Sequence, residues 1–77
     1  MKEQVLRVLE RECPDVDFAA SDKLVSSGIL DSLSLVAIIS AFTMEFGIEI
    51  PYEEIVEENF DSVDAMAAMV ERLAGGR

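Results

Sequence analysis

The chain lacks histidine and tryptophan altogether, and among its 77 residues it has a single cysteine, Cys13. Without histidine, acid–base catalysis and metal binding lose the side chain that serves them most often. One cysteine excludes an internal disulfide and a metal site built on several thiolates. Cys13 stands just before Pro14, where a helix is expected to end, so we interpret it as a small, partly buried apolar residue rather than a reactive thiol.

Basic residues are also scarce. Six lysines and arginines stand against 16 aspartates and glutamates, which gives a formal net charge of −10. Phosphate backbones and anionic membranes repel such a chain, so we expect neither nucleic acid nor a membrane surface as a partner. A basic protein surface would be attracted, although the acidity serves solubility equally well.

Long apolar runs are missing too. The chain has no signal-peptide pattern and no run of about 18 apolar residues, which a membrane-spanning helix would need. We therefore expect a cytoplasmic protein without membrane insertion. The length predicts a single domain over residues 1–77, and the apolar content of 51% is enough to fill one core.

What the sequence does contain is helical periodicity. Residues 2–12 place an apolar stripe among alternating charges and stop before Pro14. A second helix is expected over residues 32–46, with Asp31 as its N-cap and Gly47 as its stop. Between these helices lies a long first loop, and the apolar residues expected to hold it on the core are Phe18, Leu24 and Val25.

Two further helices are expected after the second. A short one over residues 52–59 follows Pro51, which suits the first turn of a helix. The last one, over residues 63–74, is capped by Asp61 or Ser62. Its apolar positions are Val63, Met66, Ala67, Met69, Val70 and Leu73. The last three residues are expected to fray. The sequence therefore predicts an all-α fold, a small four-helix bundle of three main helices and one short helix.

The second helix is unusual, because residues 32–44 carry no charge in a chain of which 29% is charged. Its predicted core-facing stripe consists of Leu35, Ile38, Ile39, Phe42 and Phe46, with Val36 at the margin. The opposite stripe consists of Leu33, Ala37, Ser40 and Met44. Either the long first loop covers this outer stripe, which periodicity alone slightly favours, or the stripe is a docking face for other proteins, anchored by Leu33 and Met44.

Ser32 lies in the first turn of this uncharged helix. Backbone N–H groups without a helical partner and the positive end of the helix dipole converge there, so a phosphate on this serine would be stabilised. Serine is also an ordinary capping residue at the start of a helix, and this simpler interpretation stays open at the level of the sequence.

The segments GILDSLSLV, FGIEIP and FDSVDAM resemble the acyl carrier proteins and their carrier-domain relatives, over essentially the whole chain and in the same order. The residues that carry the resemblance are Asp31, Ser32 and Leu33 after Ile29 and Leu30, with support from Phe46, Ile50, Pro51, Glu53, Glu54 and Phe60. The resemblance implies that Ser32 is esterified to 4′-phosphopantetheine, which a separate phosphopantetheinyl transferase takes from coenzyme A. It further implies that Asp31 assists this magnesium-dependent transferase and that Leu33 contacts partner enzymes.

On this resemblance the protein is a monomeric phosphoprotein with no catalysis and no metal of its own. It would carry acyl or aminoacyl groups as thioesters on the thiol of the cofactor arm. A loading ligase and a downstream synthase or transferase would be its other partners. Fatty acyl groups, as in fatty acid biosynthesis, polyketide chains, D-alanine and other amino acids all stay open as cargo.

One departure separates the chain from typical fatty-acid carriers, which have several acids along the helix that follows the serine. Here the first acid in that helix is Glu45. D-alanyl and peptidyl carriers depend more on apolar helix contacts and look closer in this respect. The residues expected to dock partner enzymes are Leu33, Ala37, Met44, Glu53 and Glu54. Together with Glu57 and Glu58, however, the two last-named glutamates form an acid cluster that fits a solvated helix face better than a docking site.

Functions of other classes fit less well. A serine hydrolase would need a base beside its nucleophile, and the chain has neither a histidine nor a G-x-S-x-G motif. A calcium-binding EF-hand loop starting at Asp15 fails, because Ala19 and Ala20 fall where a ligand and a glycine are required. The remaining alternative is an unmodified helical interaction module, which would dock through Leu33 and Met44 and keep Ser32 as a cap.

Overall fold

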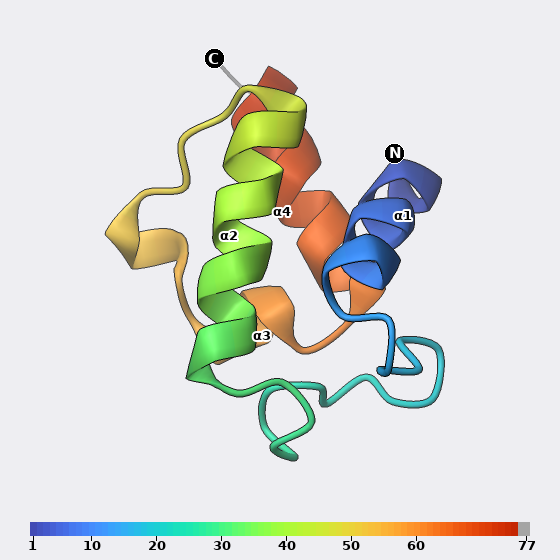
Figure 1. Cartoon of the computed structure of the whole chain (residues 1–77). Coiled ribbons are helices and arrows are strands. Elements are labelled where there is room, and N and C mark those ends of the chain that lie inside the picture. The colour runs from blue at the N-terminus through green and yellow to red at the C-terminus, as the bar shows by residue number, and fades with distance from the viewer. Residues whose placement is uncertain (76–77) are drawn as a thin grey trace.

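The computed structural model describes residues 1–75, which form a helical bundle (Figure 1). Its elements are α1 (Lys2–Glu12), α2 (Ser32–Phe46), the 3-10 turn η1 (Tyr52–Glu54), α3 (Glu57–Phe60) and α4 (Val63–Gly75). The described residues contain no strand, so the predicted all-α bundle of three main helices and one short helix is confirmed. Gly75 still belongs to α4, so the expected fraying does not include it, and the same expectation for Gly76 and Arg77 lies outside the described residues.

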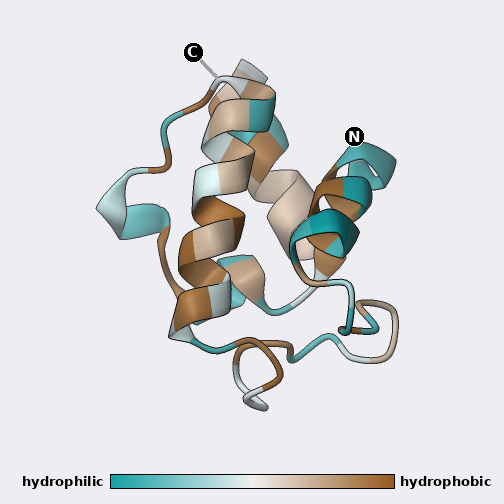
Figure 2. Ribbon diagram, viewed as in Figure 1, coloured by the Kyte–Doolittle hydropathy of each residue, from teal (hydrophilic) through white to brown (hydrophobic). Residues whose placement is uncertain are grey.

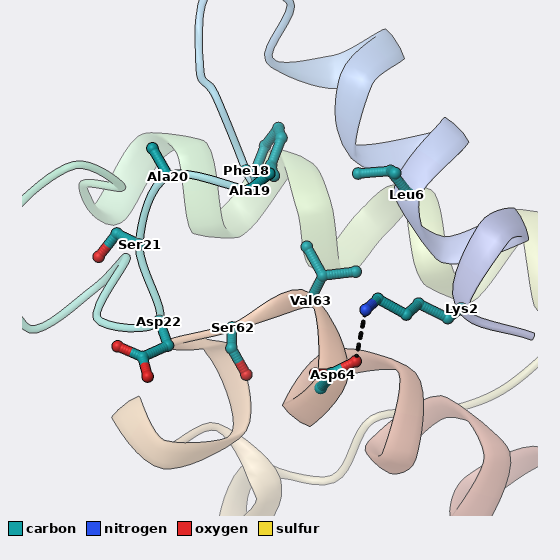
Figure 3. A pocket seen from close by; sticks show the side chains of 10 residues that line it. All are labelled: Lys2, Leu6, Phe18, Ala19, Ala20, Ser21, Asp22, Ser62, Val63 and Asp64. Atoms are coloured by element: carbon teal, nitrogen blue, oxygen red, sulfur yellow. Dashed lines mark ion pairs between the residues drawn. The ribbon is translucent and has the colours of Figure 1, made fainter.

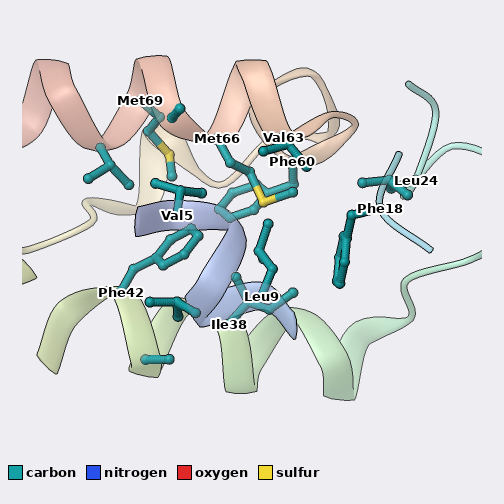
Figure 4. Close-up of a cluster of buried hydrophobic side chains, with 14 of the residues drawn as sticks. Val5, Leu9, Phe18, Leu24, Ile38, Phe42, Phe60, Val63, Met66 and Met69 are labelled. Carbon is teal, nitrogen blue, oxygen red and sulfur yellow. The ribbon is translucent and has the colours of Figure 1, made fainter. Parts of the chain in front are cut away.

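The core lies between the helices (Figure 4). The large side chains with less than 2% of their surface exposed are Val5, Leu9, Leu24, Ile38, Phe42, Phe60, Met66, Met69 and Val70. They come from all four helices and from the long loop, so every element contributes to one cluster. Burying a side chain of this size contributes about 1.5–3 kcal/mol, which explains how so short a chain holds together.

The first helix and the long loop after it follow the prediction. α1 ends where the N–H of Cys13 donates to the carbonyl of Leu9 at 2.8 Å, and the next residue, Pro14, has no N–H with which to continue the helix. Cys13 is half-buried against the core, as predicted. The loop residues expected to hold the loop on the core also do so, since Phe18 and Leu24 are buried and Val25 is half-buried.

The central helix, α2, begins and ends as predicted, and its predicted core-facing stripe is confirmed, since Ile38 and Phe42 are buried and Leu35, Ile39 and Phe46 are half-buried against the core; only the edge of the stripe differs. Asp31 is its N-cap, and Gly47 ends it in the left-handed conformation at φ 63° that glycine adopts without strain. The residues buried on its inner side are Ile38, Ala41 and Phe42. Val36, predicted at the margin of the core stripe, is 63% exposed, whereas Ala41, which the prediction left out, is buried. Because α1 and α4 both pack on this helix, their placement decides which side chains are covered.

The short helix predicted over residues 52–59 is wrong as a single element. Pro51 is extended, at φ −68° and ψ 156°, and stands outside any helix. The η1 turn follows, the non-helical residues 55 and 56 interrupt the segment, and α3 begins only after them. The Asn59 side chain donates to the carbonyl of Glu54 at 2.7 Å and so satisfies a backbone group at the break. The interruption lets Phe60 turn into the core, where it is 1% exposed.

The last helix, α4, is capped by Ser62, whose hydroxyl oxygen accepts the N–H of Ala65 at 3.0 Å. Asp61, the other predicted cap, instead binds the long loop. The predicted apolar face is confirmed, since Val63, Met66, Ala67, Met69 and Val70 are buried and Leu73 is half-buried. Within the described part of the chain, no helix combines the length and the apolar content that crossing a membrane requires.

Candidate functional site

Ser32 is the first residue of α2 and is exposed, at the end of the bundle where the long loop meets this helix (Figure 1). The residue that caps the helix is its neighbour Asp31, whose Oδ1 accepts the N–H of Ser34 at 2.9 Å. The carbonyl of Asp31 also accepts the N–H of Leu35 at 3.0 Å, one helical turn later. The interpretation of Ser32 as the cap is therefore wrong, because Asp31 fills this position.

The electrostatics around Ser32 combine a helix end with one carboxylate. The N–H of Ser34 holds the pKa of the Asp31 carboxyl below its usual range, so this group is ionised at neutral pH. The first turn of α2 contributes partial positive charge from its backbone N–H groups. A phosphate on Ser32 would be stabilised by the helix end, and its oxygens together with the Asp31 carboxylate are the ligands that a hard divalent cation prefers.

Side chains alone do not build a metal centre in the described residues, which contain no group of three or more cysteines, aspartates and glutamates that could hold an ion. The chain also has no histidine to act as a base for Ser32. What the arrangement offers is therefore an accessible hydroxyl that another protein's active site can reach, next to a carboxylate.

The outer face of α2 is open. Leu33 is 81% and Met44 is 85% exposed, so the long loop does not cover this face, and the interpretation that periodicity slightly favoured is wrong. Val36 joins the exposed set, whereas Ala37 is half-buried. Figure 2 shows the helix with apolar or near-neutral colouring over most of its length. The name α2 stripe is used below for its three exposed large residues, Leu33, Val36 and Met44.

The sequence prediction missed further exposed apolar residues in the segments before and after α2. They are Ile29 in the loop, Tyr52 in η1, and Ile55 and Val56 in the break before α3. Tyr52 is 87% exposed, the highest value of any large apolar side chain in the described residues. The sequence did contain a signal for their exposure, because these apolar residues stand next to acidic and turn-forming residues, which keep short segments at the surface.

The two glutamates expected to dock partners differ in their surroundings. Glu53 is exposed. The Glu54 carboxylate pairs with Arg72 of α4 and accepts the Asn59 side-chain amide at 3.1 Å, so it is engaged within the chain. Exposed Glu57 and Glu58 fit the solvated helix face that the sequence favoured.

A hollow of about 560 Å³ lies elsewhere, between α1, the loop and the start of α4 (Figure 3). Leu6, Phe18 and Val63 form its apolar part, and an ion pair of 2.8 Å between Lys2 and Asp64 stands at its edge. Neither Ser32 nor the α2 stripe lines this hollow, so it is separate from the candidate site.

The comparison with protein families gives one match. The model described as "Phosphopantetheine attachment site" matches residues 1–70, which is the bundle from α1 to near the end of α4. Curated proteins and solved structures gave no match. Members of this family carry 4′-phosphopantetheine, and the residues around Ser32 fit such a group, because an accessible hydroxyl stands at a helix start that favours phosphate. With a match over most of its length, this chain belongs to the phosphopantetheine attachment site family and is a phosphopantetheine-carrying carrier protein.

Proposed function

We propose that this protein carries acyl or aminoacyl groups on a 4′-phosphopantetheine attached to Ser32 and performs no catalysis itself. The observation that supports this most strongly is the exposed Ser32 hydroxyl at the start of α2, next to a cap that Asp31 supplies. The proposal includes a monomeric single domain and a cytoplasmic location.

Each residue at the helix start has a role in the attachment. The Ser32 oxygen forms a bond to the phosphorus of the phosphopantetheine phosphate of coenzyme A, while the bond from that phosphorus to adenosine 3′,5′-bisphosphate breaks. The hydroxyl proton passes to a base of the transferase. The ionised Asp31 carboxylate would help to hold the magnesium ion that the transferase uses. Once attached, the cofactor supplies a terminal thiol that carries the cargo as a thioester.

The partners in this proposal are a phosphopantetheinyl transferase, a loading ligase and a downstream synthase or transferase. These partners bind the α2 stripe through apolar contacts, and the exposed Glu53 carboxylate adds an electrostatic contribution. The only acid in α2, Glu45, lies 3.3 Å from Arg11 of α1 and is partly neutralised by it. This uncharged face favours an aminoacyl cargo, such as D-alanine, over the fatty acyl cargo of carriers with an acidic helix.

The test of the proposal is the intact mass of the protein after coexpression with a broad-specificity phosphopantetheinyl transferase. We expect one added phosphopantetheine per chain. The unmodified interaction module, which the sequence left open, is not supported by the family match and would show no added mass. An unmodified product, under conditions that fully modify a known carrier, would contradict the proposal.

Docking through the α2 stripe predicts that Leu33→Glu and Met44→Glu impair loading. Both side chains are more than four-fifths exposed, so the helix content should not change. The new glutamate would be buried at the centre of the interface without a partner for its charge. We therefore expect the KM of the transferase for the apo-protein to rise by about tenfold or more. Steady-state kinetics with the purified apo-protein measure this change.

Gln4→Glu provides the matched control for these variants, because it adds the same charge at an exposed position of α1. Its KM should equal that of the native chain. If Gln4→Glu raises the KM as much as Leu33→Glu does, net charge and not the α2 stripe governs docking. A loss of helical circular dichroism in Leu33→Glu would show that the face assignment is wrong.

A further inference from the structure

Asp61, between α3 and α4, is hydrogen-bonded to the loop that leads to Ser32. Its Oδ1 accepts the N–H groups of Val25 and Ser26, both at 2.8 Å, and its Oδ2 accepts the Ser26 hydroxyl at 2.6 Å. Its carbonyl accepts the N–H of Leu24, also at 2.8 Å. One residue therefore binds three consecutive loop residues that lie about 35 positions away in the sequence.

The loop transmits this anchor to the start of α2. The carbonyl of Leu24 accepts the N–H of Leu30 at 2.8 Å, and both side chains are buried in the core. Leu30 directly precedes Asp31, the cap of α2, and Ser32 follows. Asp61 is thus hydrogen-bonded to Leu24, and Leu24 is hydrogen-bonded to Leu30, the residue that directly precedes the cap of α2.

The residues between these two leucines form a closed turn. The N–H of Ser27 donates to the carbonyl of Lys23 at 2.8 Å, and the N–H of Gly28 donates to that of Val25 at 3.0 Å. Gly28 adopts φ +87°, which a residue with a side chain would adopt only with strain. Hydrogen bonds within the turn therefore connect its residues to one another, and the hydrogen bonds to Asp61 hold its first part.

Hydrogen bonds at the anchor keep Asp61 ionised. The Ser26 hydroxyl, and after it the N–H groups of Ser26 and Val25, lower the pKa of the Asp61 carboxyl, to which Lys23 also contributes. The Glu57 carboxylate lies 3.4 Å from the same hydroxyl, but Ser26 has one hydroxyl proton and Asp61 is the nearer acceptor. An ionised carboxylate accepts all three hydrogen bonds, which makes each stronger than a bond between neutral groups.

We propose that Asp61 is a positioning residue for cofactor attachment, which holds residues 24–30 so that Ser32 meets the transferase in one orientation. The inference rests on the proposed function, since it presumes that Ser32 is the attachment residue. Asp61 acts through Leu24 and Leu30 and stands apart from the α2 stripe in sequence and in secondary structure. Without it, the transferase would still bind α2, but the hydroxyl would be aligned in fewer of the bound molecules.

Positioning and plain stability predict different kinetics. Unfolded molecules only dilute the folded substrate, so a variant that is merely less stable raises the apparent KM and leaves kcat unchanged. A folded variant with a poorly held loop binds through α2 and reacts slowly, so its kcat falls while its KM stays the same. For Asp61→Ala we expect kcat to fall about tenfold, well within the ~100-fold that a misplacement of 1 Å can cost.

The experiment measures initial rates of phosphopantetheine transfer from coenzyme A to the full-length apo-protein over a range of protein concentrations. Ser26→Ala removes the hydroxyl contact but keeps both N–H contacts, so its kcat should fall by less than that of Asp61→Ala. Asp61→Asn keeps an acceptor oxygen for the N–H groups and offers an amide to the Ser26 oxygen, so it should restore most of the rate. Amide hydrogen exchange at Val25 and Ser26 should be faster than in the native chain in Asp61→Ala but not in Asp61→Asn.

Asp64→Ala is the matched control, because it removes an equally charged, exposed carboxylate from the first turn of α4 that pairs with Lys2 and not with the loop. Its kcat should equal that of the native chain. The inference is overturned if Asp61→Ala keeps the native kcat, raises only the KM, or behaves like Asp64→Ala. If Asp61→Ala does not fold, an unchanged kcat and unchanged exchange in Ser26→Ala overturn it instead. A native chain that accepts no phosphopantetheine would refute the proposed function itself.

Discussion

Replacing Ser32 by alanine is expected to abolish phosphopantetheine attachment completely while changing the free energy of unfolding by no more than about 0.5 kcal/mol. Attachment needs the oxygen, and no other atom of the side chain replaces it. Stability should be spared because Ser32 is exposed and the capping hydrogen bond belongs to Asp31. Alanine also has the highest helix propensity, so α2 should form as before. Intact mass after incubation with transferase and coenzyme A measures the first effect, and urea unfolding the second.

Ser40→Ala is the control for this variant, because Ser40 is also an exposed serine of α2, about two turns further along the helix. It should be modified as fully as the native chain. If Ser32→Ala gains the same mass as the native chain, the attachment residue lies elsewhere. If both variants lose the modification, the change in α2 and not the missing hydroxyl is responsible.

The second large effect concerns the core. Phe42→Ala should lower the free energy of unfolding by about 3–5 kcal/mol, as expected when a buried aromatic side chain is removed and leaves a cavity. Phe42 is fully buried, and its ring centroid lies 5.9 Å from that of Phe46. Figure 4 shows it pointing from α2 into the space between the helices, together with Val5 and Met69. Since small proteins are stable by only about 5–15 kcal/mol, this loss would remove a large share of the total stability.

Met44→Ala tests the same helix on its opposite face. Its side chain is 85% exposed, so this variant should stay within about 0.5 kcal/mol of the native chain in urea unfolding. The comparison separates burial from helix propensity, because both variants place alanine in α2. A loss of less than 1 kcal/mol in Phe42→Ala, or equal losses in both, would contradict the packing described for α2.

Features that depend on a few neighbouring residues could be predicted from the sequence. The limits of α2 follow from Asp31 at one end and Gly47 at the other, and each acts within one turn of the helix. The end of α1 at Cys13 followed in the same way from Pro14. The exposed Ser32 at the start of α2 was therefore predictable, and so was its fit to the family.

Features that depend on distant packing could not be predicted. The edge of the core-facing stripe of α2, where Ala41 is buried and Val36 is exposed, is set by α1 and α4 lying on its inner side. A small residue gives no hydrophobic signal for such burial. The break before α3 depends on Phe60 reaching the core and on the Asn59 contact with Glu54, and neither is visible in a local pattern.

The same limit applies to the site. Asp61 looked like one of two caps for α4, because its position before the helix is equally suited to capping. Its actual partners, Val25 and Ser26, are 36 and 35 residues away. Periodicity also could not show whether the long loop covers the outer face of α2, because this depends on the path of the loop, which leaves Leu33 and Met44 exposed.

The most direct test of the attachment residue is fragmentation mass spectrometry of the protein isolated from its own cells. We predict that the chain carries one 4′-phosphopantetheine and that the fragments place it on residue 32. A protein that is unmodified in the cell and also rejects the group from coenzyme A in the presence of a competent transferase, or fragments that place the group on another residue, would contradict this prediction.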